Sequence, residues 1–170
     1  MGALTDRLID RQERALGADL SYLRSLADAS TAAFAKFALA VPVMQHRDVI
    51  PTSPWHLARL GATRAQDCGT CLQIVVNAAL AGGVPAETLR HALGDASGLG
   101  DTERLALDYG EAVASKAGAR ADTIDAVRVR FGEAGLVELA LAVATVQLFP
   151  LLKRGLGQDV ACSRVDVRVG

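Results

Sequence analysis

The sequence predicts an all-α, single-domain helical bundle, and three observations support this class. Apolar residues recur at helical spacing along most of the chain, and Asp, Pro and Gly residues stand at the expected helix boundaries. The 170 residues are 51% hydrophobic, which is enough to bury one core. We therefore expect one helical domain without extensive disorder.

Residues 1–50 are predicted to form an amino-terminal extension of two amphipathic helices. The first begins with the apolar pattern of residues 4–9 and ends near Gly17. Asp19 caps the second, which continues until Pro42 because proline cannot continue a helix.

Further helices are predicted as far as about residue 157. Ser53-Pro54 is a strong helix start and favours a helix over 55–66, and Gly82-Gly83 stops the next helix, over 70–81. Later helices are expected to begin at Pro85, Asp101 and Asp122.

The segment 135–152 is nearly continuously apolar, which at this length indicates a helix buried on all sides. Pro150 is expected to kink or end it. Glu138 and Gln147 are its polar exceptions. Because a buried polar group needs a partner, we expect each to meet a hydrogen-bond partner or a subunit interface rather than to perform chemistry.

The tail, residues 158–170, has a different pattern. Charged residues and valines alternate in the order Arg164, Val165, Asp166, Val167, Arg168, Val169. This two-residue period predicts a strand. Because a single strand leaves its backbone unpaired, the tail is expected to be disordered or exchanged between subunits of an oligomer.

The charge balance argues against two classes of partner. With 18 basic and 19 acidic residues, the chain has no electrostatic footprint for nucleic acid or for an anionic membrane. The most apolar early stretch, 31–44, is short and carries Lys36 and Pro42. We expect a cytoplasmic protein with no nucleic-acid or membrane partner.

The most informative motif is Cys68-Gly69-Thr70-Cys71, at the start of a predicted helix. If Asp67 caps that helix, both thiols lie in its first turn, where the helix dipole favours a thiolate and the i, i+3 spacing lets the sulfurs approach. The charge of Asp67 acts in the opposite direction, so the net pKa shift is open. Since cytosolic disulfides tend to be catalytic or redox-sensing, thiol–disulfide chemistry is the leading expectation.

Two other interpretations of the cysteines remain. Both can be small buried hydrophobic residues. A zinc site would need Cys68, Cys71 and Cys162 together with one of the three histidines, but the chain has neither a second CxxC nor a closely spaced His pair. We therefore expect no metal and no cofactor. The three histidines are His46, His56 and His91.

Four segments carry a family resemblance: the CxxC motif, the run 77–85 that closes its helix, the segment 101–109, and the entry 136–140 into the last apolar helix. With these, the core of residues 51–157 resembles the carboxymuconolactone decarboxylase family, in particular its alkylhydroperoxidase D-like branch. The resemblance implies an all-helical fold of that type that assembles into homo-oligomers.

The resemblance also implies two kinds of chemistry. In the alkylhydroperoxidase branch, the cysteine pair reduces a hydroperoxide or disulfide substrate and is re-reduced by a dithiol partner, such as a lipoyl protein or a thioredoxin-like protein. The decarboxylase branch has no CxxC, and a lactone acid loses carbon dioxide through acid–base residues. Cys68 and Cys71 favour the redox branch. Which thiol attacks is open, since the helix dipole favours Cys68 and the family relay favours Cys71.

The chain departs from the family at both relay positions. Val75 stands where the redox branch has a histidine, and His56 stands where it has a glutamate. Val75 cannot carry a proton, whereas His56 can. We expect His56 to pack against the next helix at the thiols or one turn beyond, and to stabilise the thiolate or accept its proton.

The predicted catalytic residues are therefore Cys68, Cys71 and His56, in a thiol-dependent oxidoreductase. Because both relay positions differ, a non-catalytic helical oligomer that senses redox state or is purely structural is the alternative. A cofactor-free lactone decarboxylase is a weaker third hypothesis.

Overall fold

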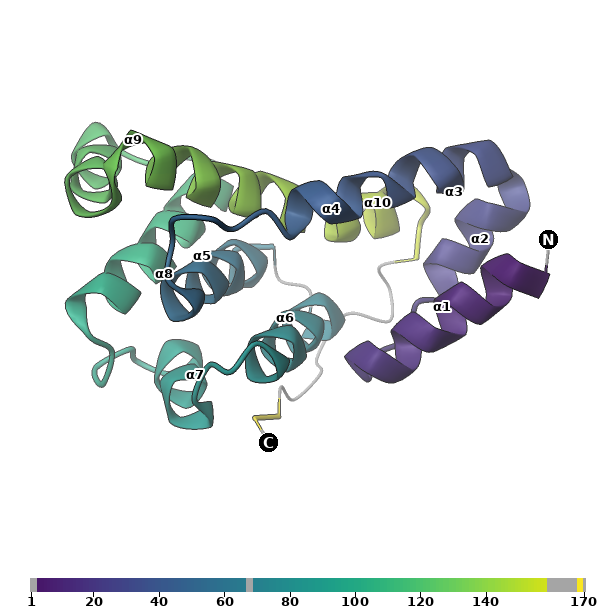
Figure 1. The fold of residues 1–170 in the computed structure, drawn as a ribbon, viewed down its shortest axis with the longest axis horizontal. Coiled ribbons are helices and arrows are strands. Elements are labelled where there is room, and N and C mark those ends of the chain that lie inside the picture. Colours follow the sequence, from purple (N-terminus) through teal and green to yellow (C-terminus); the bar gives the residue numbers. More distant parts are fainter. Residues whose placement is uncertain (1–2, 67–68, 159–167, 170) are drawn as a thin grey trace.

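A computed structural model describes residues 3–66, 69–158 and 168–169 of the chain. Every regular element in these ranges is a helix, which confirms the all-α class (Figure 1). The helices are α1 (Ala3–Leu16), α2 (Ser21–Ala29), α3 (Thr31–Ala38), α4 (Ala40–Met44), α5 (Thr52–Arg64), α6 (Gly69–Ala81), α7 (Ala86–Leu93), α8 (Asp101–Ala114), α9 (Ala121–Val146) and α10 (Leu148–Gly155).

Helix α5 is the centre of the main core. All residues from 54 to 63 are buried, and α5 packs against α6, α7, α8 and α9. Two glycines let α5 and α8 approach closely, because a Cβ at Gly61 would overlap the backbone of Leu107 and one at Gly110 would overlap the backbone of Ala58. This packing fixes the position of α5 and hence the directions of its side chains.

A second, smaller core joins the amino-terminal helices to the rest of the chain. Its buried residues come from α1, α2 and the turn between them, and Ile74 of α6 and Phe149 of α10 pack against it. The Asn77 side chain also donates a hydrogen bond to the Leu16 carbonyl at 2.7 Å. Helices α1 and α2 of the predicted extension are thus packed onto α6 and α10, at one end of the molecule, whereas α4 packs against α9 (Figure 1).

The chain from Asp19 to Pro42 differs from the prediction of one helix, because it forms three. Ser30 has an extended backbone, and its hydroxyl accepts the N–H of Ala33 at 3.1 Å, so α2 ends there and α3 begins. Pro42 lies inside α4 rather than ending a helix. Its missing N–H falls in the first turn, where no intrahelical partner is needed.

The last apolar segment forms two helices, as the effect of Pro150 predicts. Proline has no N–H to donate to the carbonyl of Val146, and α9 ends at this residue. Helix α9 also bends at Gly132, whose φ of 74° is outside the helical region and favours glycine.

Helices α9 and α10 are buried on one side only, so the expectation of burial on all sides is wrong. Val137 and Leu151 are 57% and 52% exposed, and Leu148 is exposed beside them. The run 121–155 is long and apolar enough to cross a membrane, but 44% of its most apolar window is buried in this fold. Core helices of soluble proteins can be equally long and apolar, so length and composition are weak evidence for a membrane-spanning helix.

Most of the predicted strand-like tail lies outside the described residues. Arg168 and Val169 are described, and both contact their own chain. The Gln73 side chain donates to the carbonyl of Arg168 at 2.9 Å and accepts its N–H at 2.7 Å, while Val169 packs against the main core. Disorder or exchange of the other tail residues remains a prediction.

Candidate functional site

The cysteine motif lies at the start of α6. Asp67 and Cys68 fall outside the described residues, as does Cys162, so the predicted cap and the approach of the two sulfurs remain predictions. Cys71 lies in the first turn of α6, and its side chain is only 5% exposed. This thiol is therefore covered by the fold rather than presented on the surface.

The side chains that follow Cys71 along α6 have structural roles. Val75, one turn further on, is buried in the main core and offers no proton carrier at the family relay position. Gln73 donates a hydrogen bond to Asn77 at 2.8 Å, and these two amides also bond to Arg168 and Leu16. The side chains of Gln73 and Asn77 thus hold Arg168 and the end of α1 against α6.

His56 lies at the opposite end of α6 from Cys71. Its Nε2 atom is 2.5 Å from the place where a Cβ on Gly82 would stand. Cys71 and Gly82 are separated by about 16 Å along the helix axis, at about 1.5 Å per residue. The expectation that His56 packs at the thiols or one turn beyond is therefore wrong. The physical reason is that α5 and α6 run antiparallel, so the start of α5 meets the end of α6.

The imidazole of His56 is held in its neutral form. Burial, and then repulsion from Arg59 and Arg47, lower its pKa to about 4, and the side chain is 6% exposed. Its ring makes an edge-to-face contact with the ring of Trp55, with 4.8 Å between centroids. A neutral ring at this distance from Cys71 does not supply an ion-pair partner for a thiolate.

Arg59 is a functional candidate that the sequence interpretation missed. Its guanidinium carbon lies 4.4 Å from the centroid of the Trp55 ring, and the side chain is 9% exposed. It forms no ion pair with a described residue. Burial lowers its pKa to about 10, so the group is still charged at neutral pH.

Four neighbouring side chains of α5, here named the α5 polar cluster, share an unusual property. Each has a buried polar atom without a hydrogen-bond partner among the described residues. Buried polar groups in native proteins are nearly always paired, so these four atoms need a partner that the described residues do not supply. The atoms are Ser53 Oγ, Trp55 Nε1, His56 Nδ1 and Arg59 Nε.

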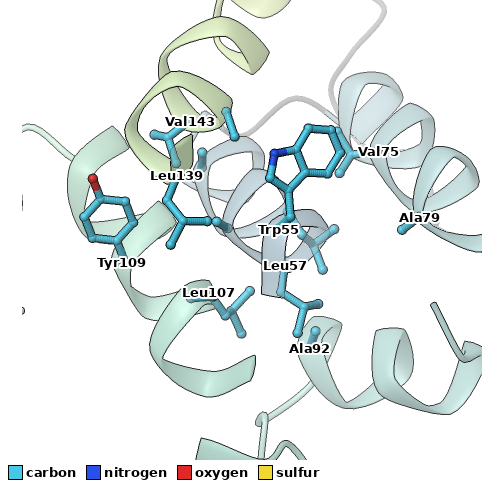
Figure 2. Packing of buried hydrophobic residues seen from close by; sticks show 14 of the residues in the cluster. Trp55, Leu57, Val75, Ala79, Ala92, Leu107, Tyr109, Leu139 and Val143 are labelled. Atoms are coloured by element: carbon cyan, nitrogen blue, oxygen red, sulfur yellow. The ribbon is translucent and has the colours of Figure 1, made fainter. Parts of the chain in front are cut away.

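Trp55 of the α5 polar cluster faces the helix that carries Cys71. In Figure 2 the ring of Trp55 points toward Val75 of α6, and both residues belong to the main core. Arg59 is one turn beyond Trp55, and Cys71 is one turn before Val75. Because the helices are antiparallel, Arg59 lies nearer than Trp55 to the connection between α5 and α6, and Cys71 lies nearer to it than Val75. The cluster and the cysteine motif therefore belong to one helix pair.

The expectations for Glu138 and Gln147 are confirmed, since both meet hydrogen-bond partners. The Glu138 carboxylate accepts the three backbone N–H groups of residues 48–50 at 2.8 to 3.0 Å. Burial acts to raise the pKa of Glu138, but these hydrogen bonds outweigh it and lower the pKa. Gln147 accepts from Gln66 at 3.0 Å and donates to the Val143 carbonyl at 3.1 Å.

The fold and the site define an all-α protein with a cysteine at the start of one core helix and a buried arginine on its antiparallel neighbour. Within the described ranges, no three His, Cys, Asp or Glu side chains are grouped to hold a metal ion. The chain matches no known family model, no curated protein and no solved structure. The resemblance to the alkylhydroperoxidase D-like branch therefore rests on the sequence motifs alone.

Proposed function

We propose that the protein is a thiol-dependent oxidoreductase in which Cys68 and Cys71 form the redox couple. The supporting observation is the position of Cys71 in the first turn of α6, three residues after Cys68. The first turn of a helix has unpaired N–H groups and the positive end of the helix dipole, which favour a thiolate. The i, i+3 spacing suits a disulfide within one turn.

For a hydroperoxide substrate, the thiolate sulfur attacks a peroxide oxygen. An S–O bond forms, the O–O bond breaks, and the leaving alkoxide takes a proton and departs as an alcohol. The other thiol then attacks the sulfenic acid, so that the disulfide forms and water leaves. A dithiol reductant, such as a lipoyl protein or a thioredoxin-like protein, restores both thiols and is itself oxidised to a disulfide.

Neither relay position of the family places a proton carrier beside Cys71. Val75 is buried at one relay position, and His56, at the other, lies about 16 Å along α6 from Cys71. Thiol–disulfide exchange depends on the thiolate fraction and on access rather than on a dedicated proton relay. We therefore give His56 no part in the thiol chemistry.

The same observation favours one alternative function, a non-catalytic redox sensor. A sensor needs a cysteine pair that oxidises reversibly, but it does not need repeated turnover or a relay. We also propose a cytoplasmic homo-oligomer, supported by the exposed apolar face of α9 and α10 formed by Val137, Leu148 and Leu151.

Thiol quantification and turnover assays on the full chain test this proposal. The protein is treated with cumene hydroperoxide or oxidised lipoamide, with and without excess dithiothreitol. We expect loss of both motif thiols and repeated turnover with the dithiol, with no turnover in Cys68→Ser or Cys71→Ser. Cys162→Ser is the matched control and should retain full activity. Oxidation without turnover would favour the sensor, and intact thiols would contradict both functions.

A further inference from the structure

We propose that the α5 polar cluster is a binding site for a small organic carboxylate. The proposal rests on the chemistry of Trp55, His56 and Arg59 and on the charges around them. It does not depend on the reactivity of the cysteines, so it stands or falls separately from the proposed redox function.

Arg59 is the first reason for this assignment. An isolated buried charge is strongly unfavourable, and proteins compensate it with an opposite charge. The Trp55 ring stabilises the guanidinium through a cation–π contact at 4.4 Å, but a ring face does not pair the Nε donor. Among the described residues, no carboxylate forms an ion pair with Arg59. An anion is the partner that this side chain requires.

The donor set indicates what kind of anion fits. The Nε1 atom of Trp55 and the Nε atom of Arg59 can only donate hydrogen bonds, whereas the hydroxyl of Ser53 can do either. A ligand rich in acceptor oxygens satisfies this set. Because Arg59 is the one buried cation of the cluster, a singly charged carboxylate balances it better than a phosphate dianion. The guanidinium fork also matches carboxylate geometry.

The surrounding charges favour entry of an anion. Arg47 is exposed, and both Arg47 and Arg59 act electrostatically on His56. Arg47 donates to the Ile50 carbonyl at 3.2 Å and makes no ion pair with a described residue. The nearby carboxylate of Glu138 is already engaged by backbone N–H groups. Glu138 and the exposed Asp48 carry negative charges on or near this segment, but neither pairs with Arg47 or Arg59, so both cations remain available to an anion.

The single tryptophan of the chain makes the test direct. Because Trp55 is the only tryptophan, the ¹⁵N-labelled protein gives one indole N–H resonance, which reports on the cluster. We would titrate the full chain with sodium acetate, sodium phosphate and sodium chloride at matched ionic strength. Acetate is expected to shift this resonance saturably, and chloride is not.

Substitutions assign the response to Arg59. Arg59→Met should weaken acetate binding by roughly tenfold or more, which corresponds to losing a charged hydrogen bond. Arg130→Met is the matched control, since Arg130 also stacks on a ring, that of Phe131 at 5.6 Å, and lies on the surface. Acetate affinity should be unchanged in this control. If Arg59→Met does not fold, Arg47→Gln provides the test at an exposed position and should weaken acetate binding severalfold.

Three results would overturn the assignment. The first is an indole resonance that does not respond saturably to acetate, since the buried donors would then need no anion. The second is tighter binding of phosphate than of acetate, which contradicts a carboxylate site. The third is an unchanged acetate affinity in Arg59→Met or, where that variant does not fold, in Arg47→Gln.

Discussion

The Nε2 atom of His56 lies against Gly82, at the end of α6 opposite to Cys71. This contact fixes the pairing of the two antiparallel helices, because the start of α5 meets the end of α6. It places His56, which occupies a relay position of the family, about 16 Å along the axis of α6 from Cys71. Any chemistry of the cysteine pair therefore proceeds without this histidine.

His56→Gln is expected to leave the alkylation rate of Cys71 unchanged within about twofold, whereas a positioned acid–base group contributes on the order of a hundredfold or more. The measurement is the rate of reaction with iodoacetamide near neutral pH, in a Cys68→Ser, Cys162→Ser background where Cys71 is the only thiol. A tenfold slower reaction would show that His56 acts on the thiol after all.

Stability is expected to fall between pH 6.5 and pH 4 because of His56. Its pKa is about 4 in the folded protein and about 6.5 when unfolded. The unfolded chain therefore binds more protons in this range, and acid favours unfolding by up to about 3 kcal/mol, at about 1.4 kcal/mol per pKa unit. Urea unfolding across this range should show a smaller pH dependence for His56→Gln than for the parent protein.

The control for this measurement is His91→Gln, because the His91 side chain is partly exposed, near Glu87. This variant also removes one histidine, so the comparison tests the buried position specifically. Equal pH profiles for the parent and His56→Gln would contradict the burial of a neutral imidazole.

Glu138→Gln is expected to lower the free energy of unfolding by about 2 to 4 kcal/mol. An amide is neutral and has one acceptor oxygen, so all three N–H groups of residues 48–50 lose a charged partner and at least one loses its acceptor. Glu133→Gln, at an exposed carboxylate paired with Arg128, should change stability by less than about 1 kcal/mol. Urea unfolding near neutral pH compares the two variants, and equal effects would refute the role of Glu138.

Charges on the exposed apolar face of α9 and α10 are expected to break the proposed oligomer. Val137→Glu and Leu151→Glu would bury a carboxylate in the interface, which is unfavourable without a partner. Val129→Glu, beyond the bend at Gly132, is the control and should keep the parent assembly. Light scattering at micromolar concentration gives the mass, and a monomeric parent protein would contradict the proposal.

Helix boundaries were predictable where a residue type acts locally. Gly82-Gly83 directly follows the end of α6, and Ser53-Pro54 and Pro150 fall in the first turns of α5 and α10, because proline and glycine constrain the backbone in any context. The helix predicted over 55–66 begins three residues earlier, at Thr52, and ends at Arg64. The break at Ser30 was missed, since serine occurs inside helices as well as at their caps. The exposed face of α9 was missed because an apolar sequence does not say how many sides other helices cover.

The candidate site was predictable only in part. The position of Cys71 in a first helical turn follows from its local sequence, and the partners of Glu138 follow from the cost of burying a carboxylate. The position of His56 depends on how α5 and α6 are aligned. The number of residues between His56 and the cysteines does not determine that alignment. Arg59 looks like a surface residue in sequence, and only the packing around α5 buries it.

Peptide mapping of the oxidised full-length protein tests the central claim most directly. After treatment with one equivalent of hydrogen peroxide, non-reducing digestion and mass spectrometry identify the crosslinked peptides. We predict an intramolecular Cys68–Cys71 disulfide as the main product, with no change of oligomeric state, because i and i+3 positions need little backbone movement. A crosslink through Cys162 as the main product, or motif thiols that stay reduced, would contradict the account.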